Sequence, residues 1–217
     1  EVGDVYYGQS NPSYFDHDSH PPGTPIPDDG VSGWTNYNSR TFSWPHVSDQ
    51  SDFHYEWKVD AGSWSDIGNS NSQSISGYSS GTHTFYVRAV DKWGNTSSAG
   101  SHNFYIDLSN PNPPVVNEDH CGGSHTGWPS WTTHDSPYFT WSDPGDDDGS
   151  GIAGYQVQVN DGSWSDVSSA WHPTYSSGSH TFNFRSIDHV GHNSSEYRIF
   201  NRAVANYREI GRKQAFK

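Results

Sequence analysis

The strongest metal-binding signal in the sequence is a short acidic run. It contains Asp143, Asp146, Asp147 and Asp148. Carboxylates this close together repel one another, and a hard cation such as calcium, which takes oxygen ligands, relieves that repulsion. The run does not fit an EF-hand loop, because Pro144 and Tyr155 stand where that motif places ligands. We predict a calcium site at the four aspartates, and the alternative is a solvated acidic turn.

Two histidine-containing clusters carry ligand types that suit transition metals. The first contains His17 and His20, and the second contains His120, Cys121 and His125. Imidazole and thiolate groups bind zinc or copper, so each cluster is a candidate transition-metal site. Neither cluster has the paired spacing of a known zinc motif, so ordinary surface histidines remain the alternative.

Candidate acid–base pairs occur without the rest of a catalytic site. Asp16 and Asp18 with His20, or Asp188 with His189, offer a carboxylate beside an imidazole, but neither group has a nucleophile in a glycine-rich elbow nearby. Asp91 and Asp188 open matching turns, which a turn-stabilising carboxylate explains better. We predict that the chain is not an enzyme.

The same residue pattern occurs twice along the chain. At an offset of ninety-seven positions, Trp34, Phe42, Trp44, Phe85, Arg88 and Asp91 recur as Trp131, Phe139, Trp141, Phe182, Arg185 and Asp188. Between these blocks the offset is one hundred, because one loop of the second copy is three residues longer. Tandem copies of a module usually supply length, spacing or repeated weak binding, whereas an enzyme needs a single set of catalytic residues in one site.

The tryptophans divide into repeated and unrepeated positions. Trp34, Trp44 and Trp64 are matched by Trp131, Trp141 and Trp164, which predicts that these six are core residues. Trp93, Trp128 and Trp171 have no counterpart. Because an indole face stacks on sugar rings, we treat these three as candidate glycan-stacking residues.

Strand signals dominate the coarse structure. Residues 53–59 and 82–90 alternate apolar and polar side chains, and turn residues punctuate such runs at short intervals in both copies. Short strands at this spacing predict an all-β fold of two tandem β-sandwiches, at residues 21–109 and 110–201. They are joined by a proline-rich linker, because Pro111, Pro113 and Pro114 favour an extended, stiff backbone.

The flanks of the two copies suggest self-assembly. Residues 1–20 form a leader in which residues 2–7 can make a short strand for donation to a neighbour's open sheet edge. Residues 202–217 form a basic tail that can meet the acidic body of the next copy in a head-to-tail contact. The expected partner is the chain itself or the remainder of a larger surface protein.

Composition narrows the partners and the compartment. The net charge of -14 repels nucleic acid and anionic lipid, and no apolar run reaches the roughly 18 residues of a membrane span. Only 30% of residues are hydrophobic, but 10 Trp, 13 Tyr and 10 Phe supply large buried area for aromatic cores. The lone Cys121 excludes an internal disulfide, and the polar, lysine-poor surface looks secreted.

Two acceptor patterns for N-glycosylation occur in the corresponding turn of each copy. They start at Asn95 and Asn193. A surface turn is where a glycan can be accommodated, so we expect a glycosylating host to use them.

Residues 55–64 and 81–95 of the first copy, with 137–143 and 149–155 of the second, resemble prokaryotic extracellular Ig-like and fibronectin type III-like repeats. The resemblance covers about four fifths of the chain. It implies Ig-like or fibronectin type III-like sandwiches, an extracellular or cell-surface location and no transferred catalytic residues. Such repeats serve as stalks, adhesin segments, filament building blocks and spacers in secreted hydrolases.

We therefore expect an extracellular structural or adhesive protein, either a cell-surface or a filament-forming subunit. One alternative is an accessory module pair that binds carbohydrate or wall material for a secreted enzyme. Another is an adhesin fragment that binds a protein partner.

Overall fold

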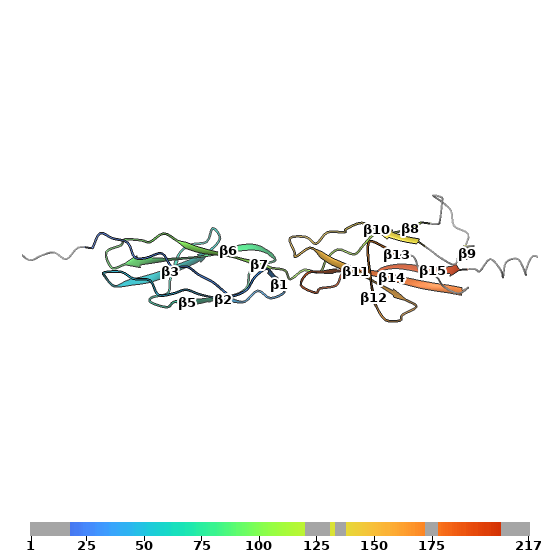
Figure 1. The fold of residues 1–217 in the computed structure, drawn as a ribbon, viewed down its shortest axis with the longest axis horizontal. Coiled ribbons are helices and arrows are strands. Elements are labelled where there is room, and N and C mark those ends of the chain that lie inside the picture. The colour runs from blue at the N-terminus through green and yellow to red at the C-terminus, as the bar shows by residue number, and fades with distance from the viewer. Residues whose placement is uncertain (1–17, 120–130, 133–137, 172–177, 205–217) are drawn as a thin grey trace, which may run out of the picture. The chain divides into compact units, whose positions relative to one another are not determined.

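The computed structural model describes residues 18–119, 131–132, 138–171 and 178–204 of the chain (Figure 1). In chain order the strands are β1 (Trp34–Thr35), β2 (Arg40–Ser43), β3 (Phe53–Val59), β4 (Ser65–Asp66), β5 (Ser72–Ile75), β6 (Gly81–Asp91), β7 (Gly100–Ile106), β8 (Val116–Asp119), β9 (Trp131–Thr132), β10 (Tyr138–Trp141), β11 (Ile152–Val159), β12 (Ser165–Val167), β13 (Ala170–Trp171), β14 (Gly178–Asp188) and β15 (Tyr197–Val204). These residues contain no helix, so none there is long and apolar enough to cross a membrane. The predicted all-β class is confirmed.

The two copies of the sequence pattern build the same large sheet. Its strand order is β1-β7-β6-β3-β4 in the first copy and β9-β15-β14-β11-β12 in the second. In both sheets the short first strand pairs in parallel with the last strand of the copy, as β1 with β7 and β9 with β15. The central pairs, β3 with β6 and β11 with β14, are antiparallel.

A smaller sheet faces the larger one in each copy. It consists of β2 and β5 in the first copy and of β13, β10 and β8 in the second. Phe42 of β2 stacks on Phe85 of β6 with ring centres 4.2 Å apart. Phe139 of β10 packs against Phe182 of β14 at 5.0 Å. Side chains from two sheets thus meet in one interior, which is the arrangement of a β-sandwich.

Aromatic side chains form these interiors, as the composition predicts. Trp44 meets Tyr55 edge-on with ring centres 5.5 Å apart, and Trp141 meets Tyr155 in the same way at 5.5 Å. Trp44 and Trp141 are only 3% and 6% exposed. Such pairs contribute about 0.5–1.5 kcal/mol each beyond the area they bury. Aliphatic residues complete the interiors: Val59, Ile75, Val87, Ala89, Ile106, Val116 and Val157.

Of the repeated tryptophans, Trp34 is half-buried against Tyr105, and the side chain of Trp131 lies outside the described residues. The prediction that the repeated tryptophans are core residues is wrong for Trp64 and Trp164. Both are half-buried and each lies under an arginine, Arg88 and Arg185 respectively. The physical reason is that each tryptophan immediately precedes a short edge strand, β4 or β12, on the outer face of the large sheet. Their repetition therefore marks a repeated surface contact and not burial.

The chain also divides into two compact units. One comprises Glu1–Gly30, Thr41–Ser74 and Thr84–Asn103, and the other comprises Val31–Arg40, Ile75–His83 and Phe104–Lys217. These units do not follow the boundary between the sequence copies, so domains at 21–109 and 110–201 stay a prediction.

The proline-containing segment after β7 is held by hydrogen bonds within the second unit. The backbone N–H of Asn112 donates to the carbonyl of Gly145, and Ser186 Oγ donates to the carbonyl of Asn112.

At the other end of the second copy, β15 continues to Val204, so the first residues of the predicted basic tail belong to a strand. Residues 1–17 of the leader and 205–217 of the tail lie outside the described residues.

Candidate metal centres

The four aspartates of the acidic run point in different directions. Asp143, Asp147 and Asp148 are exposed, and Asp143 Oδ1 accepts a hydrogen bond from the N–H of Gly145 at 2.9 Å. Asp146 is half-buried. Its Oδ2 accepts from the N–H of Gly151 at 2.8 Å, whereas its Oδ1 is buried and has no hydrogen-bond partner. Only Asp146 of the predicted set thus has an inward-facing carboxylate oxygen that lacks a partner.

Asp146 lies near buried carboxylates that the sequence analysis does not assign to a metal, because the adjacent N–H groups of Ser150 and Gly151 donate to Asp107 Oδ2 and Asp146 Oδ2. Asp107 is 0% exposed and Asp188 is 2% exposed. One ligand atom from each of Asp107, Asp188 and His192 lies within 4.8 Å of the others. Burial raises the pKa of Asp146; the N–H of Gly151 opposes this, and the charges of Asp107 and Asp188 raise the pKa further. We call Asp107, Asp146 and Asp188 the second acidic cluster.

Three segments of the chain position the second acidic cluster. Asp107 follows β7, Asp146 lies in the loop between β10 and β11, and Asp188 ends β14. The Asp107 carboxylate accepts from the N–H of Ser150 at 2.8 Å, which fixes the acidic loop against it. A Cβ at Gly149 would lie 2.5 Å from Asp146 Oδ2, so a larger residue there would have to displace this carboxylate.

A second group of three carboxylates lies in the first copy. One oxygen from each of Asp18, Asp49 and Asp91 lies within 4.8 Å of the others. Asp91 is 3% exposed, and the Asp18 side chain is 8% exposed. Asp18 Oδ1 accepts from the N–H of His20 at 2.9 Å, but Oδ2 is buried without a hydrogen-bond partner. We call these three residues the first acidic cluster.

The two acidic clusters occupy equivalent places in the repeat. Asp49 and Asp146 each stand five residues after the buried Trp44 or Trp141, and Asp91 and Asp188 end the equivalent strands β6 and β14. Asp18 and Asp107 precede the prolines of their copies, and each accepts at Oδ1 from the N–H two residues further on. The chain therefore places aspartates at the same three points of each copy, although the ligand atoms within 4.8 Å of one another are those of Asp18, Asp49 and Asp91 in the first copy and of Asp107, Asp188 and His192 in the second.

Asp91 also holds the turn that follows β6, as the sequence predicts. Its Oδ1 accepts from the N–H groups of Trp93 and Asn95, both at 2.8 Å, and its Oδ2 accepts from Asn95 Nδ2 at 2.7 Å. Desolvation raises the pKa of Asp91, but these hydrogen bonds, led by the Asn95 side chain, outweigh it and hold the pKa below its usual value. The carboxylate is therefore ionised at neutral pH.

The corresponding turn after β14 uses the same contacts. Asp188 Oδ1 accepts from the N–H groups of Val190 at 2.9 Å and His192 at 2.8 Å. His192 Nδ1 lies 2.9 Å from Asp188 Oδ2 and takes the place of the Asn95 amide. Because the two turns match, Asp91 and Asp188 present their carboxylates to the acidic clusters in similar ways.

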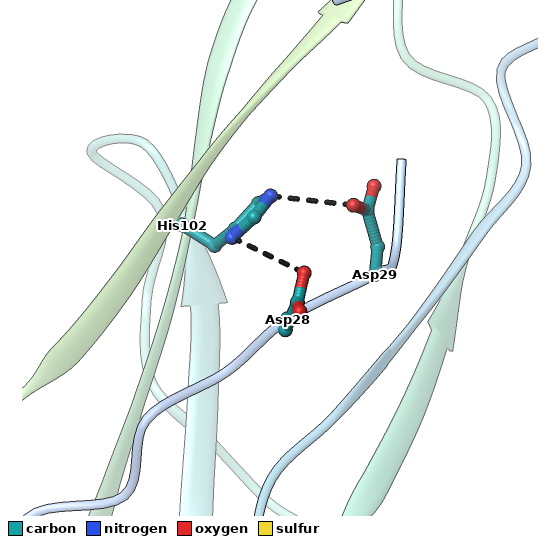
Figure 2. A group of neighbouring side chains, drawn as sticks. All are labelled: Asp28, Asp29 and His102. Atoms are coloured by element: carbon teal, nitrogen blue, oxygen red, sulfur yellow. Dashed lines mark ion pairs between the residues drawn. The ribbon is translucent and has the colours of Figure 1, made fainter. Parts of the chain in front are cut away.

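A third group contains Asp28, Asp29 and His102 (Figure 2). The His102 ring of β7 lies between the two carboxylates, with Nδ1 3.8 Å from Asp28 Oδ1 and Nε2 3.2 Å from Asp29 Oδ1. The Asp29 side chain is 1% exposed, whereas that of Asp28 is 70% exposed. Here each carboxylate faces an imidazole nitrogen, so the group fastens the segment before β1 to β7 without needing a cation.

The candidate transition-metal residues fall mostly outside the described residues. The structure does not describe four of them, which are His17, His120, Cys121 and His125. The remaining member, His20, has a side chain that is 76% exposed, with Nδ1 3.7 Å from Asp18 Oδ1. The transition-metal sites stay a prediction.

The unrepeated tryptophans have different environments. Trp93 is 47% exposed, with Lys92 Nζ 5.5 Å from its ring centre. Trp171 belongs to β13 and stacks on Phe139 at 5.7 Å, so its ring faces the interior of the second copy. Trp128 lies outside the described residues. Of the two that the structure describes, Trp93 is the more exposed.

The two predicted glycosylation residues also differ. Asn95 Nδ2 donates to Asp91 Oδ2 at 2.7 Å and to the carbonyl of Asp18 at 2.9 Å, which uses both hydrogens of the amide. Asn193 is exposed. Asn95 Nδ2, the atom to which a glycan would be attached, is therefore already engaged in two hydrogen bonds of the fold.

No family model matches the chain, and no curated protein matches it. A solved structure of fibronectin(III)-like modules of CbhA from Clostridium thermocellum is 14% identical, with a TM-score of 0.36, over 85% of this chain and 95% of that one. The FN1–FN3 domains of chicken CNTN1 are 15% identical, with a TM-score of 0.35, over 84% of this chain and 68% of that one. These similarities concern the fold alone. The resemblance seen in the sequence implies fibronectin type III-like sandwiches as well.

Proposed function

We propose that the chain is an extracellular structural or adhesive protein, a cell-surface or filament-forming subunit built of fibronectin type III-like modules. The observation that supports this most is the repeated use of equivalent side chains for equivalent structural tasks. Both copies place an arginine over a tryptophan, an aspartate within the turn after the longest strand and an edge-on Trp–Tyr pair in the core. Duplicated scaffolding of this kind suits a protein whose task is to span distance or present surface.

The acidic composition favours an extracellular setting for such a scaffold. The net charge of -14 keeps the chain soluble and away from nucleic acid and anionic lipid. The partner in this proposal is another copy of the chain or the remainder of a larger surface protein. Head-to-tail contact with the basic tail, or donation of the leader as an edge strand, would supply the link.

Two measurements test this function. Antibody against the chain should label intact, unpermeabilised cells of the source, and negative-stain electron microscopy should show ordered filaments or sheets of the purified chain. Removal of residues 1–17 or 205–217, which spares Asp18 and the end of β15, should leave folded monomers. Labelling that requires permeabilisation would contradict the extracellular role, and truncated chains that still polymerise would contradict assembly through the flanks.

Trp93 favours a second candidate function, a carbohydrate-binding accessory module. Trp93 is 47% exposed as a residue, and an exposed aromatic side chain can stack on a sugar ring. If this function is correct, soluble polysaccharide should quench tryptophan fluorescence, and Trp93→Ala should abolish the quenching. The buried Trp44 offers no such surface, so Trp44→Phe is the matched control.

A further inference from the structure

We propose that each acidic cluster binds one calcium ion, one held by Asp18, Asp49 and Asp91 and the other by Asp107, Asp146 and Asp188. The proposal does not rest on the function above, because a calcium site at these residues would serve any role of the chain. It replaces a single site on the exposed acidic run with two equivalent sites, of which only Asp146 belongs to that run.

The first argument is the state of Asp18. Its side chain is 8% exposed, yet Oδ2 has no hydrogen-bond partner, while one oxygen of each of Asp49 and Asp91 lies within 4.8 Å of an Asp18 oxygen. A buried carboxylate oxygen without a partner is costly, and two more carboxylates beside it increase the cost. A divalent cation among the three removes both penalties.

The second argument is that a buried carboxylate oxygen without a hydrogen-bond partner recurs in the second copy, where it belongs to Asp146, the counterpart of Asp49. In the second acidic cluster the adjacent N–H groups of Ser150 and Gly151 donate to Asp107 Oδ2 and Asp146 Oδ2, which places the partnerless Asp146 Oδ1 near the buried Asp107. The two clusters sit at equivalent places of a repeat whose loop lengths differ. An accidental crowding of charge would not be expected to survive a change of loop length, whereas a shared ligand explains it.

The donor chemistry selects calcium over other cations. The three aspartates of each cluster offer only oxygen, which favours hard cations over zinc or copper. The carboxylates come from separate loops and turns rather than from one rigid element, which suits the flexible coordination of calcium better than the strict octahedron of magnesium. His192 Nδ1 is occupied with Asp188 Oδ2 at 2.9 Å and so orients that carboxylate.

Calcium at these positions would join segments that are distant in sequence. In the first acidic cluster it would connect the segment before the first copy with the loop after β2 and the turn after β6. In the second it would connect the segment after β7 with the β10–β11 loop and the turn after β14. The cation would thereby order the stretch that enters each copy.

Isothermal titration calorimetry of the full chain with calcium chloride, after treatment with chelator, tests the proposal. The wild type should bind two calcium ions per chain, and Asp18→Asn and Asp146→Asn should each bind one. Asp143→Asn, which changes an exposed aspartate of the same acidic run, is the matched control and should still bind two. Each asparagine keeps the oxygen that accepts the local N–H bond, so the variants should fold.

Three outcomes would overturn the proposal. They are a wild type that binds no calcium, an Asp143→Asn variant that loses as much binding as Asp146→Asn, and binding of zinc but not calcium. If Asp18→Asn proves unfolded by circular dichroism, Asp49→Asn tests the same cluster. Asp49 is half-buried, and its carboxylate contacts Ser51 of its own loop. Retention of two calcium ions by a folded Asp49→Asn would equally exclude the first site.

Discussion

The guanidinium carbon of Arg88 lies 4.2 Å from the ring centre of Trp64, over the face of the indole. Arg185 and Trp164 repeat this contact at the same 4.2 Å. A cation held over an indole face is attracted by the negative face of the ring, and the contact also covers apolar surface at the sheet edge. The duplicated pair shows that the repeat preserves surface interactions as well as the core.

A double-mutant cycle on Arg88 and Trp64 should give a coupling free energy of about 0.5–1 kcal/mol, because the contact is only partly shielded from water. Urea unfolding of Arg88→Ala, Trp64→Ala and the double variant measures it. The equivalent cycle on Arg185 and Trp164 should agree. Coupling energies indistinguishable from zero in both copies would show that the contact contributes nothing to stability.

Truncation of one core should affect the two copies separately if the domain limits 21–109 and 110–201 are right. Phe42 and Phe139 are both 0% exposed, and Phe→Ala in a core costs about 3–5 kcal/mol. Calorimetry of Phe42→Ala should show one lowered transition and one at the wild-type temperature, and Phe139→Ala should show the converse. A single transition lowered alike by both variants would mean that the copies unfold as one unit.

Glycan should be attached at Asn193 and not at Asn95 when the chain is secreted from a host with N-glycosylation. The Asn95 amide donates to Asp91 and to the Asp18 carbonyl, and attachment would cost one of those bonds, whereas Asn193 is exposed. Mass spectrometry of glycopeptides distinguishes the two. A glycan mainly on Asn95 would indicate that modification precedes folding of this turn.

The fold was largely predictable because its signals are local. Alternation in residues 53–59 and 82–90 reflects one buried face per strand, and both segments are strands in the structure. Repetition was a weaker guide to environment. Trp44 and Trp64 are both repeated, but the first is in the core and the second is under an arginine at a sheet edge, a difference set by strand pairing that the pattern does not encode.

The acidic clusters were only partly predictable because their members come from three distant segments. The run from Asp143 to Asp148 is the densest acidic segment, yet of its four aspartates only Asp146 is half-buried and lies near the buried Asp107. A usable signal was present, since an aspartate precedes the prolines of each copy, at Asp18 and Asp107. Only the structure shows that the turns after β6 and β14 bring Asp91 and Asp188 close to Asp18 and Asp107.

Alkaline pH should destabilise the second copy partly through Tyr155. Burial raises the pKa of this half-buried phenol above its usual value of about 10, and the charge of Asp143 raises it further. A raised pKa in the folded state means that the stabilisation is complete below pH ~10 and is lost as pH rises through the folded pKa. Tyr155→Phe should therefore lose less stability than the wild type over that range.

The tyrosinate absorbance of the folded chain measures the same effect directly. Asp143→Asn should let Tyr155 ionise at a lower pH than in the wild type, because one of its two perturbing causes is removed. An unchanged titration in Asp143→Asn, together with equal alkaline stability of Tyr155→Phe and the wild type, would contradict this account of the tyrosine.

The most direct test of the paired calcium sites is thermal unfolding of the wild type and Asp146→Asn, each with calcium and with chelator. In chelator the variant should melt higher, because it removes one of three crowded carboxylates and places an amide donor at the unsatisfied Oδ1. With calcium the order should reverse, and each kcal/mol of difference should appear as roughly 4–8 °C in Tm. Melting temperatures that calcium leaves unchanged, with the variant below the wild type in chelator, would contradict the account.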